Sequence, residues 1–453
     1  MPTQTPAPDP SHGSDIEYVL KVARENHVKF IRLWFTDILG FLKSVAVPIS
    51  GLEDTLESGV SFDGASIQGF ARREESDMRA RPDPATFQLL PWRKGEQAAV
   101  GAMFCDIVRP DGTPYEGDPR WVLRRMLQRA AKLGYTFYVG PEMEFFYFKS
   151  ARGMEPLDEG GYFDLTPQDI ANDIRRDTIL TLEEMGIGVD FSHHEAAHSQ
   201  HEIDLRYSDA MTMADNTMTF RLVVKELAQK HGVYATFMPK PLAGQNGSGM
   251  HINTSLFRGS TNAFFSKDNP DHLSDEARYY IAGLLTHIPA LTLVLNQWVN
   301  SYRRLIPGYE APAYISWALQ ARSDLIRIPA HQPGREDAVR VELRSPDPAC
   351  NPYLAFACIL SAGLDGIERK LELLPPVERN VAELSEAERR SLGIRSLPAD
   401  LHSAIEEAEG STLLRETLGE HVFTKLIENK RLEYDRYRAH VTDWELEQYL
   451  AVL

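Results

Sequence analysis

Cysteine is scarce in this chain, and the three that are present stand far apart or in apolar surroundings (Cys105, Cys350, Cys358). We expect buried thiols in a reducing compartment, because neither a disulfide framework nor a cysteine-based zinc site fits such spacing. The first residues lack a basic region followed by an apolar one, so no secretory signal is expected. No apolar run approaches the length that spans a bilayer. These absences predict a cytoplasmic protein without a membrane partner.

Positive charge is also in short supply, since 48 lysines and arginines stand against 65 aspartates and glutamates, giving a formal net charge of −17. This balance argues against general nucleic-acid binding, and it means that an anionic substrate needs cations at its own site. The glycine-rich signatures G-x-x-x-x-G-K-[ST] and G-x-G-x-x-G are missing as well. Any nucleotide must therefore bind without a P-loop or a Rossmann turn.

The length of 453 residues is too great for one ordinary core, so two units are expected. Residues 1–13 are rich in Pro, Ser and Thr without periodicity and predict a disordered tail. A first unit over 14–112 combines β-rich runs with one helix starting at Ser14, and turn residues at 109–114 end it. The second unit, 113–453, predicts an α+β fold with antiparallel strands inside and helices packed outside.

Several elements of the second unit carry clear signals. Asp118 is a helix-capping residue followed by Pro at the first helical position, which predicts a helix there. Similar start and end signals predict a helix over 166–186, and a further long helix is expected over 275–302. Alternating apolar residues predict strands through 142–148 and 250–256. We expect these strands to carry the functional side chains.

The stretch 190–202, DFSHHEAAHSQHE, gathers four histidines and two glutamates. From His194 to His198 it matches H-E-x-x-H, the zinc-peptidase motif, and a zinc metallopeptidase stays as an alternative. That motif needs a helix, because only i, i+4 spacing on a helix brings both histidines to one face. Apolar residues alternate with period two on both sides of the stretch, which predicts strand, loop and strand instead. Glu195 and Glu202 are then the better candidates to bind a cation.

Two further glutamates share one face of a predicted strand. Glu142 and Glu144 are two positions apart, so both side chains point the same way. A solvated face would be the simple interpretation, but Phe146 and Phe148 continue that face. A carboxylate pair beside apolar side chains is costly to bury without cations, and this favours a metal site.

The last constellation is a set of arginines in segments rich in Tyr, Pro and Ile. Five fall within 41 positions: Arg304, Arg322, Arg327, Arg340 and Arg344. Surface salt bridges would explain one or two of them, whereas five in so acidic a chain suggest fixed positive charge for carboxylate or phosphate groups. Glutamates for divalent cations and arginines for oxyanions predict a metal-dependent enzyme of the phosphoryl-transfer kind.

Several long motifs, in order along the chain, resemble those of class I glutamine synthetase. They are residues 240–251 (KPLAGQNGSGMH), 300–312 (NSYRRLIPGYEAP), 344–353 (RSPDPACNPY), 62–66 (FDGAS) and 193–195 (HHE). The resemblance extends from about residue 15 to the C-terminus. It implies an N-terminal β-grasp domain followed by a larger catalytic domain with an antiparallel curved sheet and outer helices.

The same resemblance implies an activity and an assembly. ATP would phosphorylate the γ-carboxylate of glutamate, and ammonia would displace phosphate from γ-glutamyl phosphate to give glutamine. Two or more Mg²⁺ or Mn²⁺ ions would serve each active site. The subunits would form a homo-oligomer, a dodecamer of two hexameric rings with active sites shared between neighbours.

The positions that match the family's motifs carry its roles by resemblance. One cation would be held by Glu144, Glu195 and Glu202, and a second by Glu142, His251 and Glu342. The residues nearer to ATP would be Asp190, Asn253, Thr254, Ser255, Arg322 and Arg327. The residues that meet glutamate would be Asn246, Gly247, Arg304 and Arg344.

The ammonium site and the catalytic groups follow in the same way. Asp63 and Ser66 of the adjacent subunit, with Tyr162, would bind ammonium, and Asp63 would help to deprotonate it. Glu310, on a loop framed by Pro and Gly, would shield the acyl phosphate from water. Arg322 would stabilise the transferring phosphate. A γ-glutamyl-amine ligase of the same family is the alternative, but such relatives tend to lose the ammonium pocket, which this chain keeps.

The chain departs from the family pattern at a few positions. Ala321 stands where Asn is usual, and residues 195–200 differ from the common continuation at His198 and Ser199. Ala382 occupies the place where some members carry an adenylylated tyrosine, so that regulation is not expected. Arg72 resembles the arginine that relays feedback inhibition by glutamine in one subtype.

Overall fold

The computed structural model describes residues 10–70, 77–93 and 99–453. Arg72 and residues 1–9 lie outside these ranges. Helix α1 spans Pro10–Glu25 and therefore starts earlier than the Ser14 start expected from the sequence. Proline suits the first helical position, because its missing N–H would have no intrahelical partner there.

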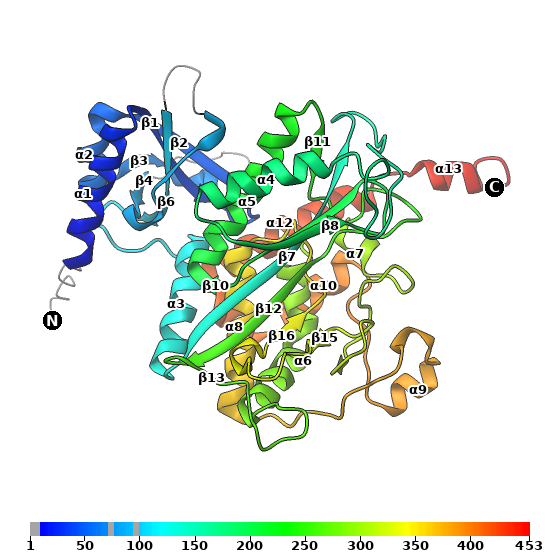
Figure 1. Cartoon of the computed structure of the whole chain (residues 1–453). Coiled ribbons are helices and arrows are strands. Elements are labelled where there is room, and N and C mark those ends of the chain that lie inside the picture. The colour runs from blue at the N-terminus through cyan, green and yellow to red at the C-terminus, as the bar shows by residue number, and fades with distance from the viewer. Residues whose placement is uncertain (1–9, 71–76, 94–98) are drawn as a thin grey trace.

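The N-terminal domain is a β-grasp sheet with two helices against it (Figure 1). Its strands are β1 (Val28–Thr36), β2 (Leu42–Pro48), β3 (Val60–Asp63), β4 (Asp77–Pro82), β5 (Gln88–Leu89) and β6 (Ala99–Val108), and its helices are α1 and α2 (Leu52–Ser58). The order is β2-β1-β6-β4-β3, with β1 and β6 parallel. Ile31 and Leu33 alternate along β1 into a core shared with Val19 of α1.

The second domain is built on a sheet of order β14-β15-β16-β12-β7-β9-β8. Its main strands are β7 (Thr136–Phe148), β8 (Val189–His194), β9 (Gln200–Leu205), β12 (Met250–Arg258), β14 (Trp317–Ala318), β15 (Ile326–Arg327) and β16 (Val341–Leu343). Short strands β10 (Ser208–Asp209) and β11 (Tyr234–Thr236) pair with β7, and β13 (Thr261–Asn262) pairs with β12. The central pairs β8–β9, β9–β7, β7–β12 and β12–β16 are all antiparallel, as predicted.

The helices of this domain lie outside the sheet (Figure 1). They are α3 (Pro119–Lys132), α4 (Asn172–Glu184), α5 (Ala210–Lys230), α6 (Asp275–Leu295), α7 (Ser301–Arg304), α8 (Pro352–Arg369), α9 (Glu386–Ser391), α10 (Leu401–Glu409), α11 (Thr412–Leu418), α12 (Glu420–Arg438) and α13 (Asp443–Tyr449). The predicted cap is confirmed at α3, where the Asp118 side chain accepts a hydrogen bond from the Arg120 N–H.

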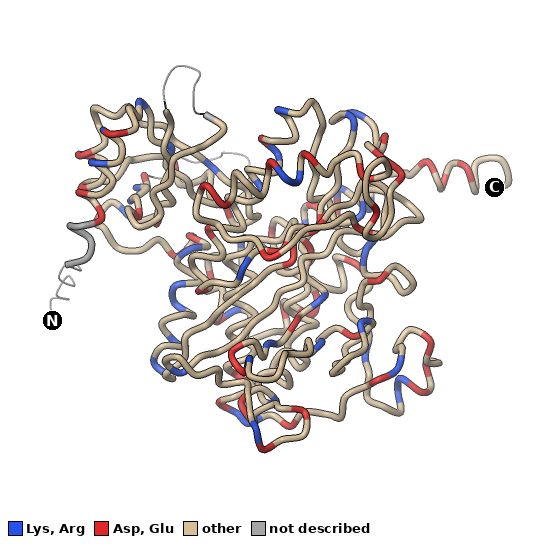
Figure 2. Tube along the Cα trace, in the orientation of Figure 1, with Lys and Arg blue, Asp and Glu red and all other residues tan. Residues whose placement is uncertain are grey.

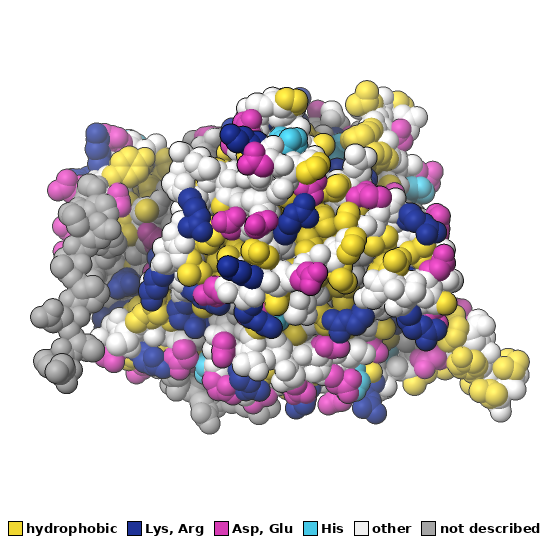
Figure 3. Space-filling view, turned by 90° about the horizontal axis from the view of Figure 1, so that it is seen from below, with side chains coloured by type: hydrophobic (Ala, Val, Ile, Leu, Met, Phe, Trp, Pro, Cys, Tyr) yellow, Lys and Arg dark blue, Asp and Glu magenta, His cyan; other side chains and the backbone are white. Residues whose placement is uncertain are grey.

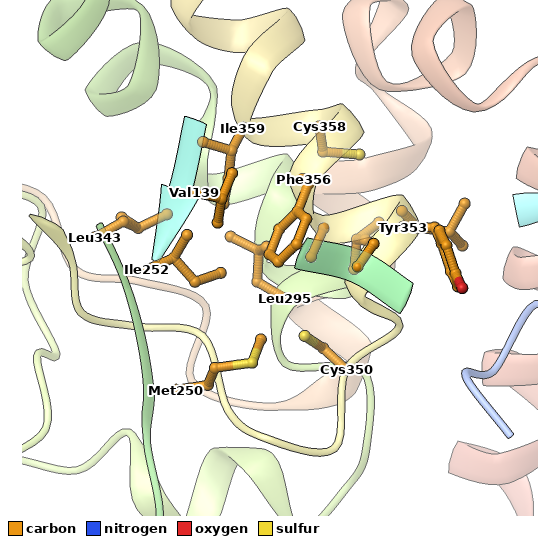
Figure 4. Packing of buried hydrophobic residues seen from close by; sticks show 14 of the residues in the cluster. Val139, Met250, Ile252, Leu295, Leu343, Cys350, Tyr353, Phe356, Cys358 and Ile359 are labelled. Carbon is orange, nitrogen blue, oxygen red and sulfur yellow. The ribbon is translucent and has the colours of Figure 1, made fainter. Parts of the chain in front are cut away.

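The helix-facing side of the large sheet forms the main core. Val139 of β7, Ile252 of β12 and Leu343 of β16 meet Leu295 of α6 and Phe356 of α8 (Figure 4). Burial of each such side chain stabilises the folded state by about 1.5–3 kcal/mol, so this layer holds the sheet in place. The opposite side of the same strands is thereby left to carry polar groups.

Two helix predictions need correction. The helix expected over 275–302 is broken, because buried Asn296 leaves helical geometry at φ −139° and donates to the carbonyl of Ser345 and the carboxylate of Asp347. The helix expected from residue 166 begins only at Asn172. The helix 275–302 therefore ends where a buried Asn side chain finds acceptors 49 and 51 positions further along the chain.

Helix α6 is long and apolar enough to cross a membrane by length and composition alone. However, 72% of its most apolar window is buried inside the protein, where it packs along α8. A helix that is apolar all round is expected at such a place in the core of a large domain. Its composition is therefore explained by packing.

The two domains are joined by a buried ion-pair network centred on Arg120 of α3. Its guanidinium reaches Asp83 at 2.8 Å, Asp106 at 2.5 Å and Asp215 at 3.0 Å, and only 4% of its side chain is exposed. Asp83 and Asp106 belong to the N-terminal domain, whereas Asp215 belongs to α5. Removing one partner of such a network leaves buried charge uncompensated.

We predict that Arg120→Met lowers the free energy of unfolding by about 3–5 kcal/mol, because three carboxylates lose their common partner. Arg124→Met is the matched control, since Arg124 also pairs with Asp106 but 35% of its side chain is exposed. Its loss should be below about 1 kcal/mol. Denaturant unfolding followed by fluorescence measures both. Equal effects of the two substitutions would contradict the assigned role of Arg120.

Candidate active site

One group of acidic side chains gathers where β7, β9 and β8 lie side by side. The strand register places Glu144 opposite Glu202 and Glu202 opposite His193, so the three side chains form a row across one face. Glu195, in the turn after β8, accepts a hydrogen bond from His193 Nε2 at 2.9 Å. Donor atoms of His193, Glu195 and Glu202 lie within 4.8 Å of one another and could hold a metal ion. We call Glu144, Glu195 and Glu202 the turn group.

Glu144 is held in place from two sides. One of its carboxylate oxygens accepts from Gln200 Nε2 and from the Gly249 N–H, each at 2.9 Å. Burial, and next the negative charge of Glu195, raise the pKa of Glu144 to about 8. When this buried carboxyl group is ionised, a nearby cation stabilises its negative charge.

A second row runs along the neighbouring positions of β12, β7 and β9. His251 stands opposite Glu142, and Glu142 stands opposite Asp204. His251 Nδ1 lies 3.0 Å from a Glu142 oxygen and 3.8 Å from a Glu342 oxygen. Glu142, His251 and Glu342 again place donor atoms within 4.8 Å of one another. We call these three residues the strand group.

Arginines surround the strand group. Glu342 is fully buried and is paired with Arg327 at 2.7 Å and with Arg344. Arg304, only 2% exposed, donates to the carbonyls of Arg344, Ser345 and Pro346. Arg304 therefore fixes the backbone from which Arg344 extends.

The glycine-rich loop 245–249 faces the turn group. Its Asn246 side chain donates to Glu310 at 2.6 Å, and the Gly247 carbonyl accepts from Gln200 at 3.1 Å. A Cβ at Gly247 would lie 2.3 Å from the Pro239 carbonyl oxygen, so only glycine fits. Glu310 itself adopts a left-handed φ of 52°.

Tyr162 and Arg322 reach the same region from two loops. The Tyr162 ring lies edge-on to His193 with 5.3 Å between centroids, and burial raises the pKa of its phenol while the nearby Arg322 opposes this shift. Asp63 and Ser66 are elsewhere, at the end of β3 and in the following turn of the N-terminal domain. Figure 1 shows β3 in the N-terminal sheet and β8 in the large sheet in the middle of the molecule. Asp63 and Ser66 therefore belong to a different domain from the other predicted catalytic residues, Glu310 and Arg322.

A cleft of about 260 Å³ opens beside the strand group. Its lining includes Glu142, Asp190, Asn253 and Ser255. Asn253 donates to Glu142 at 2.8 Å and accepts from Arg340 at 2.9 Å. Aromatic and basic residues that were not predicted complete the lining: Tyr138, Phe191, Tyr207 and Arg335. The Thr254 hydroxyl, in contrast, turns into the core and donates to the Val341 carbonyl.

The sheet face that carries the turn group and the strand group has more acidic side chains than arginines to balance them. Acidic residues follow the strands through the middle of the molecule (Figure 2). Burial, followed by the neighbouring charge of Asp204, raises the pKa of Glu202 well above its ordinary value. Burial and Glu142 raise that of Asp204 to about 8. For Glu142, burial is outweighed by hydrogen bonds from His251 and Asn253, and its pKa falls to about 2. Carboxylate and imidazole donors in this arrangement fit hard divalent cations.

Besides the lining of the cleft, three polar residues of the sheet face were missed from the sequence, namely His193, Gln200 and Asp204. Gln200, Glu202 and Asp204 are two positions apart along β9, so their shared face could have been found from the period of the strand. His193 could not, because its role depends on the pairing of β8 with β9.

The predicted strand, loop and strand around the H-E-x-x-H match is confirmed. His194 ends β8 and His198 lies in the turn before β9, so the two histidines are not on a helix. The geometry that a zinc peptidase requires is therefore missing from this stretch. His194 is instead hydrogen-bonded to Asp158.

The fold and the site define an enzyme that uses divalent cations to act on anionic substrates. Comparison with known families is specific. The family model described as glutamine synthetase, catalytic domain, matches residues 116–449, and the one described as glutamine synthetase, beta-Grasp domain, matches residues 27–110. The chain belongs to the class I glutamine synthetase family, and its activity is the ATP-dependent synthesis of glutamine.

Individual relatives agree with this assignment. The glutamine synthetase of Methanosarcina mazei is 54% identical over 96% of this chain and 98% of its own length. That of Mycolicibacterium smegmatis is 53% identical over 96% and 99%. A solved structure described as a GmaS/ADP complex has a TM-score of 0.87 at 32% identity over 96% and 99%. Plasmodium falciparum glutamine synthetase has a TM-score of 0.86 at 26% identity over 99% and 100%.

We predict that Mg²⁺ binding releases protons at pH 7. Without a cation, Glu144 and Asp204 hold protons there, because their pKa values are about 8, and a cation binds the ionised form. Affinity should rise as the pH approaches 8 and level off above it. In the metal-free protein, stability should fall as the pH rises toward 8, because the folded state holds protons that the unfolded chain would release.

Calorimetry in two buffers of different protonation enthalpy measures this release. Glu144→Gln should release about one proton fewer. The rise in melting temperature caused by Mg²⁺ should also be larger at pH 8.5 than at pH 6. The same heat in both buffers would contradict the assigned protonation states.

Proposed function

We propose that the turn group and the strand group each hold one divalent cation, Mg²⁺ or Mn²⁺, during glutamine synthesis. The support is that the two rows place oxygen and imidazole donors on one buried sheet face, where burial, and next the charge of neighbouring carboxylates, raise the pKa values of Glu144 and Asp204. The cations would supply positive charge to the phosphates of ATP and to the transferring phosphoryl group. The cleft beside the strand group, lined by Asp190, Asn253 and Ser255, would take the nucleotide, with the backbone of Thr254 beside it.

The arginines and the glycine-rich loop would bind glutamate. Arg344, on the backbone fixed by Arg304, is suited to the substrate carboxylate. Asn246 and Gly247 would meet the amino-acid end of the substrate from the other side. The γ-carboxylate would then attack the γ-phosphorus of ATP, and Arg322 and Arg327 would stabilise the charge that develops on the phosphoryl oxygens.

Glu310 would close over the acyl phosphate. Its hydrogen bond to Asn246 links the two loops that border the turn group, so the contact would exclude water from γ-glutamyl phosphate. The same carboxylate would attract ammonium and accept a proton from it as the amide bond forms. Phosphate leaves as the nitrogen lone pair bonds to the carbonyl carbon.

A neighbouring subunit would complete the ammonium site. Asp63 and Ser66 belong to the N-terminal domain and Tyr162 to the loop between β7 and α4, and we expect Asp63 and Ser66 of another copy beside Tyr162. A site shared between neighbouring copies requires an oligomer, and we propose the dodecamer of two hexameric rings that the family resemblance implies. Helix α13 stands clear of the body (Figure 1), and Figure 3 shows hydrophobic side chains at that end. Trp444 and Leu450 there, exposed at 59% and 77%, are suited to contact between subunits.

We also propose a cytoplasmic location, feedback control of the kind suggested by the segment around Arg72, and a division of the chain into 14–112 and 113–453. Three buried cysteines fit a reducing compartment.

The test is the balance between phosphate and glutamine. The protein should release phosphate only with ATP, glutamate and ammonium together, in a one-to-one ratio with glutamine. Glu310→Ala should slow glutamine formation about 10²-fold or more and release phosphate in excess over glutamine, because water reaches the intermediate. Glu372→Ala, in an exposed loop, is the control. Turnover with putrescine but not with ammonium would contradict ammonia as the acceptor.

A further inference from the structure

A second cluster of titratable side chains lies behind the turn group. Asp158, His194 and His201 are all buried, with donor atoms within 4.8 Å of one another. None of the three enters the proposed chemistry, although His194 and His201 belong to the histidine-rich stretch that stands out in the sequence. Asp158 comes from the loop between β7 and α4, so the cluster joins two distant parts of the chain.

His194 is bonded at both ring nitrogens. Nε2 lies 3.0 Å from a carboxylate oxygen of Asp158, and Nδ1 lies 2.7 Å from the backbone carbonyl of Glu195. Both contacts are to oxygen atoms, so the ring is held in place at both of its nitrogens. The ring thus links the Asp158 loop to Glu195, whose side chain belongs to the turn group.

Asp158 holds the other end of the same turn. The oxygen that meets His194 also accepts from the Ser199 N–H at 3.0 Å, and the Ser199 hydroxyl lies 2.8 Å from the Asp158 nitrogen. Ser199 adopts a left-handed φ of 58°, a conformation that costs a non-glycine residue energy and needs such support. The turn 195–199 is therefore fixed to Asp158 at both of its ends.

The loop is fitted closely to His194. A Cβ at Gly160 would lie 2.7 Å from His194 Nε2, so a side chain there would displace the ring. The Phe163 N–H donates to the His194 carbonyl at 3.1 Å, and Tyr162 packs on His193. One link accordingly positions both Glu195 and the segment that carries Tyr162.

The cluster is not built as a metal site. His201 Nδ1 lies 2.9 Å from Arg175 Nη1, and because a guanidinium only donates, Nδ1 is the acceptor. Nε2 then carries the hydrogen and offers no lone pair to a metal. Arg175 itself is paired with Asp169 at 2.7 Å, so a positive charge already stands beside His201.

We propose that the Asp158–His194 pair is a positioning device that sets Glu195 in place for cation binding. The inference rests on the proposed role of Glu195 as a ligand. Outer partners of metal ligands typically contribute 10–100-fold to metal affinity, because they fix the orientation of the ligand before the ion arrives. Asp158 and His194 act here through the turn backbone and do not touch the substrate.

The experiment measures Mn²⁺ affinity by electron paramagnetic resonance on the full-length protein, without ATP or glutamate, together with the melting temperature in EDTA. Asp158→Asn and His194→Gln should each weaken binding about tenfold. His198→Gln, in the same turn but with no role in the link, should stay within about twofold of the wild type, as a residue outside the outer shell should. Asp158→Asn keeps the shape of the side chain and carries the test if His194→Gln fails to fold.

A double substitution separates positioning from general destabilisation. If His194 acts through Glu195, the double variant His194→Gln, Glu195→Gln should bind Mn²⁺ no more weakly than Glu195→Gln alone. Additive losses of Mn²⁺ affinity in the double variant would overturn the proposal. So would normal Mn²⁺ binding by Asp158→Asn and His194→Gln when Glu195→Gln binds Mn²⁺ more weakly. A purified protein that holds a transition metal and loses it on His201→Gln would also overturn it. Normal binding by Glu195→Gln would instead remove the ligand role on which the inference rests.

Discussion

Like charges standing side by side on one buried face of a sheet are the constraint on which this structure depends. Glu144 faces Glu202, and Glu142 faces Asp204, on strands whose opposite side chains lie about 5 Å apart. Each ionised pair repels, and burial removes the water that would weaken the repulsion. The face is stable only with protons, arginines or cations on it. That requirement couples folding to the binding of the ions that the reaction uses.

The rest of the domain makes this costly arrangement possible. The other side of the same strands is apolar and packs on α6 and α8, so the sheet keeps its shape while its polar face carries unfavourable charge. Arg327 and Arg344 balance Glu342, whereas the turn group has His193 and Gln200 as its partners. The difference leaves the turn group with the greater need for a cation.

The sequence predicted the sheet face better than it predicted the links between loops. The two-residue spacing of Glu142 and Glu144 was enough to place both side chains on one face of a strand. The alternation of apolar residues around His194 was enough to reject a zinc-binding helix there. The resemblance to a known family supplied the partners from distant strands. The contact of His194 with Asp158, 36 residues earlier, followed from neither, because loop packing leaves no periodic signal. The break at Asn296 was hidden for a similar reason, since it depends on acceptors near residue 345.

The most direct test of the account is to locate the cations themselves. Crystals grown with Mn²⁺ and ADP, measured near the manganese absorption edge, give an anomalous difference map that identifies each ion. The account predicts one peak enclosed by the turn group and a second enclosed by the strand group, beside the nucleotide. Peaks absent from both groups, or a peak among Asp158, His194 and His201 in their place, would contradict it.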